Sequence, residues 1–64
     1  MTIVIRSEKI RNFLVEIRQT ENTYQVTLSH QCGDEDYYRV DKTSTFTDLK
    51  KATNRYNALA KAVR

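Results

Sequence analysis

The sequence predicts an α+β domain, a three- or four-stranded antiparallel β-meander with one C-terminal helix packed on one sheet face. Two observations predict it. Apolar and polar residues alternate along much of the chain up to residue 42, which is the period of half-buried strands. From residue 46 onward the apolar spacing changes to three and four residues, the period of a helix. Because 64 residues leave room for one core, we expect a single domain over residues 1–64.

The N-terminal half predicts two or three strands. Residues 2–6 are rich in β-branched side chains and favour a short strand, either separate or continuous with the next one. Residues 10–19 and 24–30 alternate with period two. The polar segment 20–23 between them has the composition of a hairpin connection, although it contains no glycine.

A further hairpin and strand precede the helix. Residues 31–36 contain the single glycine of the chain, Gly33, which can adopt a positive φ, so they predict a hairpin loop. Residues 37–42 follow as a strand, with Tyr38 and Val40 on one face. We expect this strand to end before the polar run of residues 43–45.

The C-terminal segment predicts an amphipathic helix. Thr45 and Asp48 have the spacing of a capping box, and Thr47 is an alternative cap. Lys61 and Arg64 at the far end complement the exposed carbonyl groups of the last turn. The apolar stripe of this helix comprises Phe46, Leu49, Ala52, Tyr56, Leu59 and Val63.

These periods assign a core and an open sheet face. The predicted core comprises Ile3, Ile5, Phe13, Val15, Ile17, Tyr24, Val26, Leu28, Tyr38, Val40, Phe46, Leu49, Tyr56, Leu59 and Val63. Since one helix covers only one side of a sheet, we expect the other side to be open and to offer a surface for a second copy or a partner. That side is expected to carry Val4, Ile10, Leu14, Gln25, Thr27, Ser29 and Tyr37.

Composition excludes several classes of protein. Apolar runs stop at three residues, as in Ile3-Val4-Ile5, so no membrane span is expected. The N-terminus lacks the pattern of a secretory signal, and the single cysteine cannot form an internal disulfide. We therefore expect a cytoplasmic protein that works without a membrane.

The charge is unevenly distributed, although the net charge is only +3. The five cations of residues 50–64 have no acid among them. On a helix, Lys50, Asn54, Asn57 and Lys61 fall in one row, with Lys51 and Arg55 beside it. This pattern is typical of phosphate contact as well as of an ordinary solvated face. We take the basic face, defined as Lys50, Lys51, Asn54, Arg55 and Lys61, as the candidate partner-binding site.

Other chemistry is expected to be absent. His30 and Cys32 lie close together, but no second His or Cys accompanies them, so we expect neither a metal site nor a cofactor. The pair also lacks a recognisable third group, so we expect no enzyme, and replacement of Cys32 by serine should be silent. The acids of the loop, Asp34, Glu35 and Asp36, are expected to form a solvated turn that can also contact a basic protein surface.

No motif identifies a family, but the layout resembles known proteins. A small antiparallel sheet backed by a C-terminal helix is similar to the DNA-binding domains of some tyrosine recombinases, which place the sheet in the major groove. The size and charge segregation look like short phage or mobile-element proteins, including inhibitors of CRISPR effector complexes. These resemblances of layout imply a protein that occupies a surface on nucleic acid or on a larger complex.

Two functions follow as expectations. The first is a non-enzymatic protein whose basic face docks on nucleic acid or a nucleoprotein complex. The second is a protein–protein module, either a homodimer through the open sheet face or an inhibitor that blocks a surface of a larger complex. In that second case Leu14, Tyr37 and the acidic loop are the candidate contacts.

Overall fold

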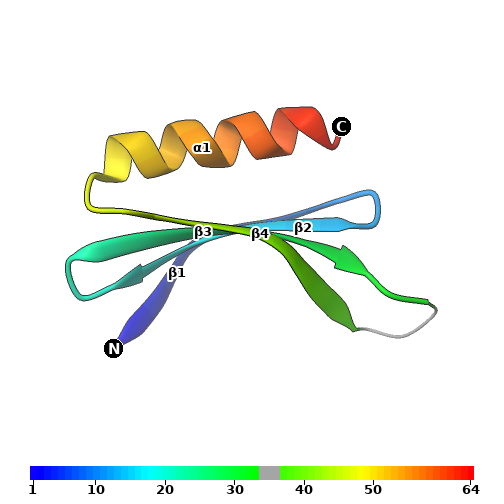
Figure 1. Cartoon of the computed structure of the whole chain (residues 1–64), viewed down its shortest axis with the longest axis horizontal. Helices are drawn as coiled ribbons and strands as arrows, with labels where there is room; N and C mark the ends of the chain where they lie inside the picture. The colour runs from blue at the N-terminus through cyan, green and yellow to red at the C-terminus, as the bar shows by residue number, and fades with distance from the viewer. Residues whose placement is uncertain (34–36) are drawn as a thin grey trace.

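A computed structural model of the chain, which describes residues 1–33 and 37–64, shows four antiparallel strands and one helix (Figure 1). The strands form one sheet in chain order, and the helix lies across one face. The predicted α+β meander is therefore confirmed, with four strands. The elements are β1 (Thr2–Ile10), β2 (Phe13–Thr20), β3 (Thr23–Gln31), β4 (Tyr38–Phe46) and α1 (Leu49–Ala62).

Two tight hairpins connect the first three strands. The turn between β2 and β3 lies within the predicted segment 20–23, and Glu21 has a φ of 54° there. The turn between β1 and β2 is at Arg11 and Asn12, and Arg11 has a φ of 56°. Residues 10–19 are therefore not one strand as predicted, because Ile10 ends β1 and pairs with Phe13.

Two β-bulges interrupt the alternation of the outer strands. In β1, Val4 pairs with Arg18 and Arg6 with Ile17, so Ile5 is an extra residue. In β4, Lys42 pairs with Leu28 and Val40 with Ser29, which leaves Asp41 as the extra residue.

Strand β4 is longer than the sequence predicts. Residues 43–45 do not end it, because they pair with residues 25–27 of β3 and the strand continues to Phe46. The bulge at Asp41 also changes which side chains face the helix. Tyr38 and Val40 pair with Gln31 and Ser29 on the open face, so the prediction that both belong to the core is wrong, and Val40 is exposed.

Helix α1 begins three residues after the start of its predicted stripe. Asp48 is the N-cap, and its carboxylate accepts a hydrogen bond from the Lys50 amide at 2.9 Å. Neither Thr45 nor Thr47 is the cap, and Phe46 is the last residue of β4 rather than a helical residue. The helix ends at Ala62, with Lys61 in its last turn.

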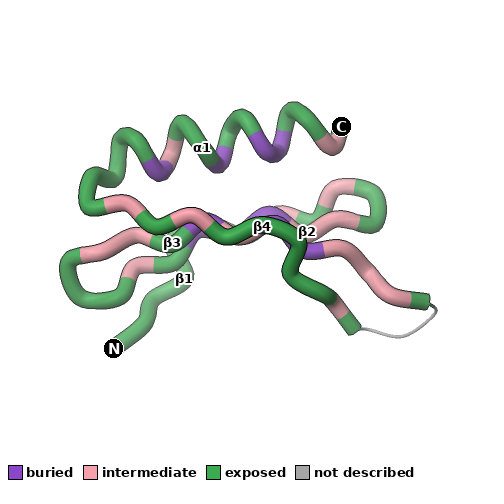
Figure 2. The backbone as a smooth tube through the Cα atoms, viewed as in Figure 1, coloured by how far each residue is buried: buried purple, intermediate pink, exposed green. Residues whose placement is uncertain are grey.

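The core lies between α1 and the middle of the sheet. Figure 2 shows buried residues on the sheet-facing side of α1 and on the strands beneath it, chiefly β2 and β3. Four expected core residues are instead exposed, namely Ile3, Ile5, Val40 and Leu49. The buried cluster comprises Val15, Ile17, Val26, Leu28, Ala52, Tyr56 and Leu59, with Phe13, Tyr24, Phe46 and Val63 packed against it.

The molecule is flat and exposes much surface for its mass. Its principal extents are 36 × 25 × 16 Å, and its accessible surface is 4703 Å². A compact monomer of this mass exposes about 4,250 Å² by the usual scaling law. The excess is about 450 Å². Three exposed aliphatic side chains, Ile3, Val4 and Ile5, lie on β1.

Candidate functional site on the outward face of the helix

The basic face of α1 points away from the sheet. At 100° per residue, Ala52, Tyr56 and Leu59 define the buried side of the helix. Lys50, Lys51, Asn54 and Lys61 fall on the opposite half, Arg55 lies at the border between the two halves, and all five residues of the basic face are exposed. The structure therefore brings together the partner-binding residues expected from the sequence, along about 16 Å of helix.

The cations of this face are not neutralised within the described residues. Among the described residues, the ion pairs made by Lys and Arg side chains join Arg18 to Glu16, and Arg6 and Arg64 to Glu8. None involves Lys50, Lys51, Arg55 or Lys61. The nearest acid in sequence, Asp48, is used as the cap of the helix. The face is thus a surface of positive charge without internal compensation from the described chain.

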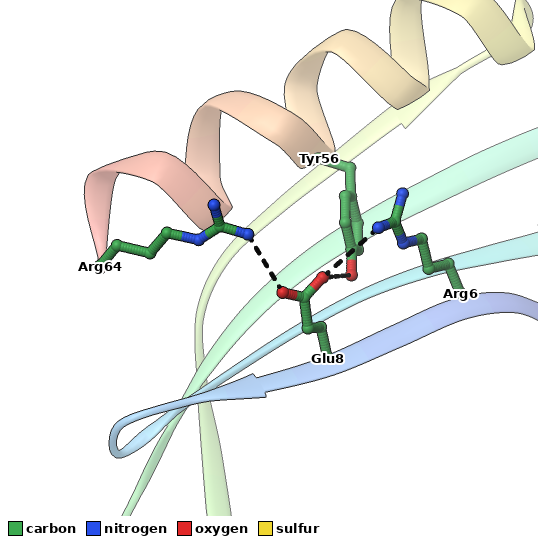
Figure 3. Close-up of polar contacts among 4 residues, drawn as sticks. All are labelled: Arg6, Glu8, Tyr56 and Arg64. Atoms are coloured by element: carbon green, nitrogen blue, oxygen red, sulfur yellow. Dashed lines mark hydrogen bonds and ion pairs between the residues drawn. The ribbon is translucent and has the colours of Figure 1, made fainter.

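Arg64 behaves differently, because it helps to fasten β1 to α1 (Figure 3). Its guanidinium donates to Glu8 Oε2 at 3.3 Å, and the Tyr56 hydroxyl donates to Glu8 Oε1 at 3.1 Å. Arg6 lies 3.7 Å from the same carboxylate, and its guanidinium carbon is 5.2 Å from the centroid of the Tyr56 ring. This cluster connects β1, which α1 does not otherwise cover, to the helix. Because Arg64 is paired with Glu8, it is not one of the cations without an ion pair.

The cluster also perturbs the phenol. Burial raises the pKa of Tyr56 above its usual value of 10.0, and the hydrogen bond and the negative charge of Glu8 raise it further. The positive charges of Arg6 and Arg64 lower it by less, so the net direction is upward. Tyr56 is therefore a protonated hydrogen-bond donor at neutral pH.

The second expected surface, the open sheet face, is mostly polar. Leu14 pairs with Ser29, and Ser29 pairs with Val40, so the three residues lie side by side across β2, β3 and β4, with the polar Ser29 between two apolar side chains. Leu14 is half-buried there, whereas Tyr37 lies just before β4 and is exposed. Ile10 pairs with Phe13 and so lies on the helix side of the sheet instead. Asp34, Glu35 and Asp36 lie outside the described residues.

His30 has a partner that sequence reasoning missed. Its Nδ1 lies 2.7–2.8 Å from the two carboxylate oxygens of Asp41, and its Nε2 lies 3.6 Å from Cys32 Sγ. Asp41 reaches His30 from the β4 bulge, eleven residues away, and no local spacing reveals that register. Within residues 1–33 and 37–64, no group of three or more His, Cys, Asp or Glu side chains, this one included, has an arrangement that could hold a metal ion.

Comparisons with known proteins add no assignment. No protein-family model matches the chain, and neither a curated protein nor a solved structure does. In the described part of the chain, no helix has the length and apolarity to cross a membrane.

Proposed function

We propose that the protein binds the phosphate backbone of nucleic acid through the basic face of α1. The observation that carries this proposal is the set of four exposed cations on that face that have no ion pair in the described chain. Free Lys and Arg side chains gain most from phosphate contact, because they release counterions without first breaking an internal ion pair. Asn54 adds an amide donor of the kind that also contacts phosphate oxygens.

The expected salt dependence follows from the number of cations. Four phosphate contacts give a slope of log K against log salt of about −3.6 for a duplex and about −2.8 for a single strand. Raising the salt from about 50 to about 200 mM should then weaken binding about 150-fold or about 50-fold respectively. Neither base readout nor sequence preference is required by phosphate contacts alone.

The test is fluorescence anisotropy with labelled duplex and single-stranded oligonucleotides. Lys51→Glu combined with Arg55→Glu should remove most of the affinity at low salt and flatten the slope by about two contacts, or about 1.8 for a duplex. The matched control is Lys9→Glu combined with Arg11→Glu, which changes the net charge equally at exposed positions off the helix. Glu21 already adopts a positive φ in the other hairpin, so the backbone at Arg11 can hold a glutamate.

Two results would overturn the proposal. One is the absence of binding by the unmodified protein at about 50 mM salt, where the electrostatic term is largest. The other is an equal loss in the control, since that would assign the affinity to net charge rather than to the basic face.

A protein–protein module is the second candidate function. It is favoured by two exposed hydrophobic side chains, Tyr37 just before β4 and Val40 on the open sheet face. Affinity capture from native lysate, with and without nuclease, separates the two. A partner retained after nuclease treatment, together with no oligonucleotide binding, would favour the protein module.

A further inference from the structure

Strand β1 carries an unpaired apolar edge. It pairs with β2 on one side, and no described strand pairs with the other side. Its N-terminal half exposes Ile3, Val4 and Ile5 by 54%, 50% and 43%. Both edge strands contain a β-bulge, but that of β4 is at a charged residue, Asp41, with Arg39 and Lys42 beside it, whereas that of β1 is at Ile5 among aliphatic residues. An apolar edge without charged side chains is a site at which another strand can add.

A pocket adjoins this edge on the helix side. It has a volume of about 200 Å³ and lies between β1 and the first half of α1. An engineered apolar cavity of about 150 Å³ accepts a benzene molecule, so this pocket has room for one apolar side chain. Leu49, half of which is exposed, forms part of its wall beside Ile5. The remaining lining residues are Arg6, Ile17, Thr53 and Tyr56.

We propose that β1 pairs antiparallel with β1 of a second copy of this chain, about a two-fold axis at Val4. Directly opposite residues of an antiparallel pair lie about 5 Å apart and share a face. In this register Ile3 of each copy lies opposite Ile5 of the other copy, beside the pocket that Ile5 lines. The two Val4 side chains face each other at the axis, so all three exposed apolar residues of the edge are covered.

Charge disfavours registers centred on the C-terminal half of β1. A two-fold axis at Arg6 would place two arginines directly opposite each other, and an axis at Glu8 would do the same with two glutamates; both are destabilising. An axis at Ser7 would pair Arg6 with Glu8 but would set Ile5 against Lys9. The axis at Val4 avoids like charges and leaves the intramolecular contacts of Glu8 in place.

The available area fits a small interface. A specific interface buries at least about 1,000 Å² in total, or about 500 Å² per copy. The exposed surface of this chain exceeds that of a compact monomer by about 450 Å², which is close to that amount. Because such an interface is small, we expect a reversible dimer that forms in the micromolar to millimolar range of concentration.

The dimer has a defined geometry. Antiparallel pairing about an axis normal to the sheet gives one continuous eight-stranded sheet with both helices on the same side. The interface is isologous, so it closes at two copies. This pairing uses β1 and the pocket, and it needs none of the residues of the basic face; failure of one proposal therefore leaves the other standing.

The chain offers a matched pair of variants to test the proposal. Val4 and Val40 are both valines in edge strands, and they are 50% and 57% exposed. Val4→Lys places two lysines opposite each other at the axis, whereas Val40→Lys changes the other edge strand and the open face. Sedimentation velocity from about 1 µM to about 1 mM should show the unmodified protein and Val40→Lys shifting from 7.5 kDa towards twice that mass. Val4→Lys should remain a monomer.

A second measurement needs no variant. Amide hydrogen exchange of residues 2–6 should slow as the concentration of the unmodified protein rises, because pairing protects the outer edge. Far-UV circular dichroism establishes that both lysine variants are folded. A protein that is monomeric throughout the range, or a dimer that Val40→Lys dissociates and Val4→Lys does not, would overturn the proposal.

Discussion

The contact between Tyr56 and Glu8 allows one stability effect to be worked out from the structure. The Tyr56 side chain is 1% exposed, and its hydroxyl donates to the Glu8 carboxylate at 3.1 Å. Tyr56→Phe keeps the ring and removes only this donor. A hydrogen bond to a charged acceptor contributes about 1.5–3 kcal/mol, and the lower value applies here because water still reaches the 31% exposed Glu8 side chain. We expect a loss of about 1.5 kcal/mol, or about 6 to 12 °C in Tm.

Replacing the ring separates the packing contribution from the hydroxyl. Tyr56→Ala deletes the largest fully buried side chain, and such changes of aromatic residues cost about 3–5 kcal/mol. A chain of this length has a free energy of unfolding of about 3–10 kcal/mol. Tyr56→Ala should therefore remove a large part of this free energy and lower the urea midpoint at least about twice as far as Tyr56→Phe.

Urea unfolding followed by far-UV circular dichroism measures both variants, because the chain has no tryptophan for fluorescence. The control is Tyr37→Phe, which removes a hydroxyl from an exposed ring and should change the free energy of unfolding by less than about 0.5 kcal/mol. All samples share one protein concentration, since dimerisation would otherwise shift the midpoint. A Tyr56→Phe effect no larger than that of the control would refute a stabilising role for the bond to Glu8.

Two further predictions concern the same helix. The pKa of Tyr56 is raised in the folded protein, so the folded state holds this proton more tightly than the unfolded state does. The resulting contribution to the free energy of unfolding is complete below a pH of about 10 and is lost as the pH rises through the pKa of the folded state. Urea midpoints should therefore fall above a pH of about 10, and less steeply in Tyr56→Phe. Asp48→Ala should cost about 1 kcal/mol by removing the N-cap, whereas Thr45→Ala should cost much less, and the reverse order in the same urea assay would assign the cap to Thr45.

The helix and β3 could be predicted from the sequence because their environments are regular. Tyr24, Val26 and Leu28 alternate along a strand that is paired on both sides and has no bulge next to β2. Ala52, Tyr56 and Leu59 keep one helical face over the whole of α1. When an element has neighbours on every relevant side, the spacing of its apolar residues matches the spacing of its buried positions, so its sequence predicts its burial.

The outer strands could not be predicted to the same depth. One extra residue at Ile5 and one at Asp41 reverse the alternation, and neither is marked by a glycine. The turn between β1 and β2 could not be predicted for a related reason. Arg11 adopts a positive φ in that turn, and arginine is not a residue type that indicates this conformation. The run at residues 43–45 was mistaken for a break, although polar side chains are normal on an open sheet face.

Of the candidate sites, the basic face could be predicted from the sequence, whereas the contact between His30 and Asp41 could not. The basic face depends only on helical periodicity and on the absence of acids after Asp48, so its placement on the exposed half of α1 followed from the sequence. The contact of Asp41 with His30 depends on the register of β4 across the bulge, which is a tertiary property. A bulge position is set by pairing with another strand, and the sequence of one strand does not contain it.

The exposure of β1 has a geometric cause. A helix with its side chains is about 10–12 Å wide, whereas strands repeat about every 4.8 Å, so one helix covers little more than two strands. Helix α1 lies over β2 and β3 and more lightly over β4, which leaves β1 held mainly through Glu8. An uncovered strand needs polar side chains or a second covering element, and the N-terminal half of β1 instead carries three aliphatic residues. Pairing with a second copy resolves this conflict, because it covers that half and leaves the basic face of each helix free.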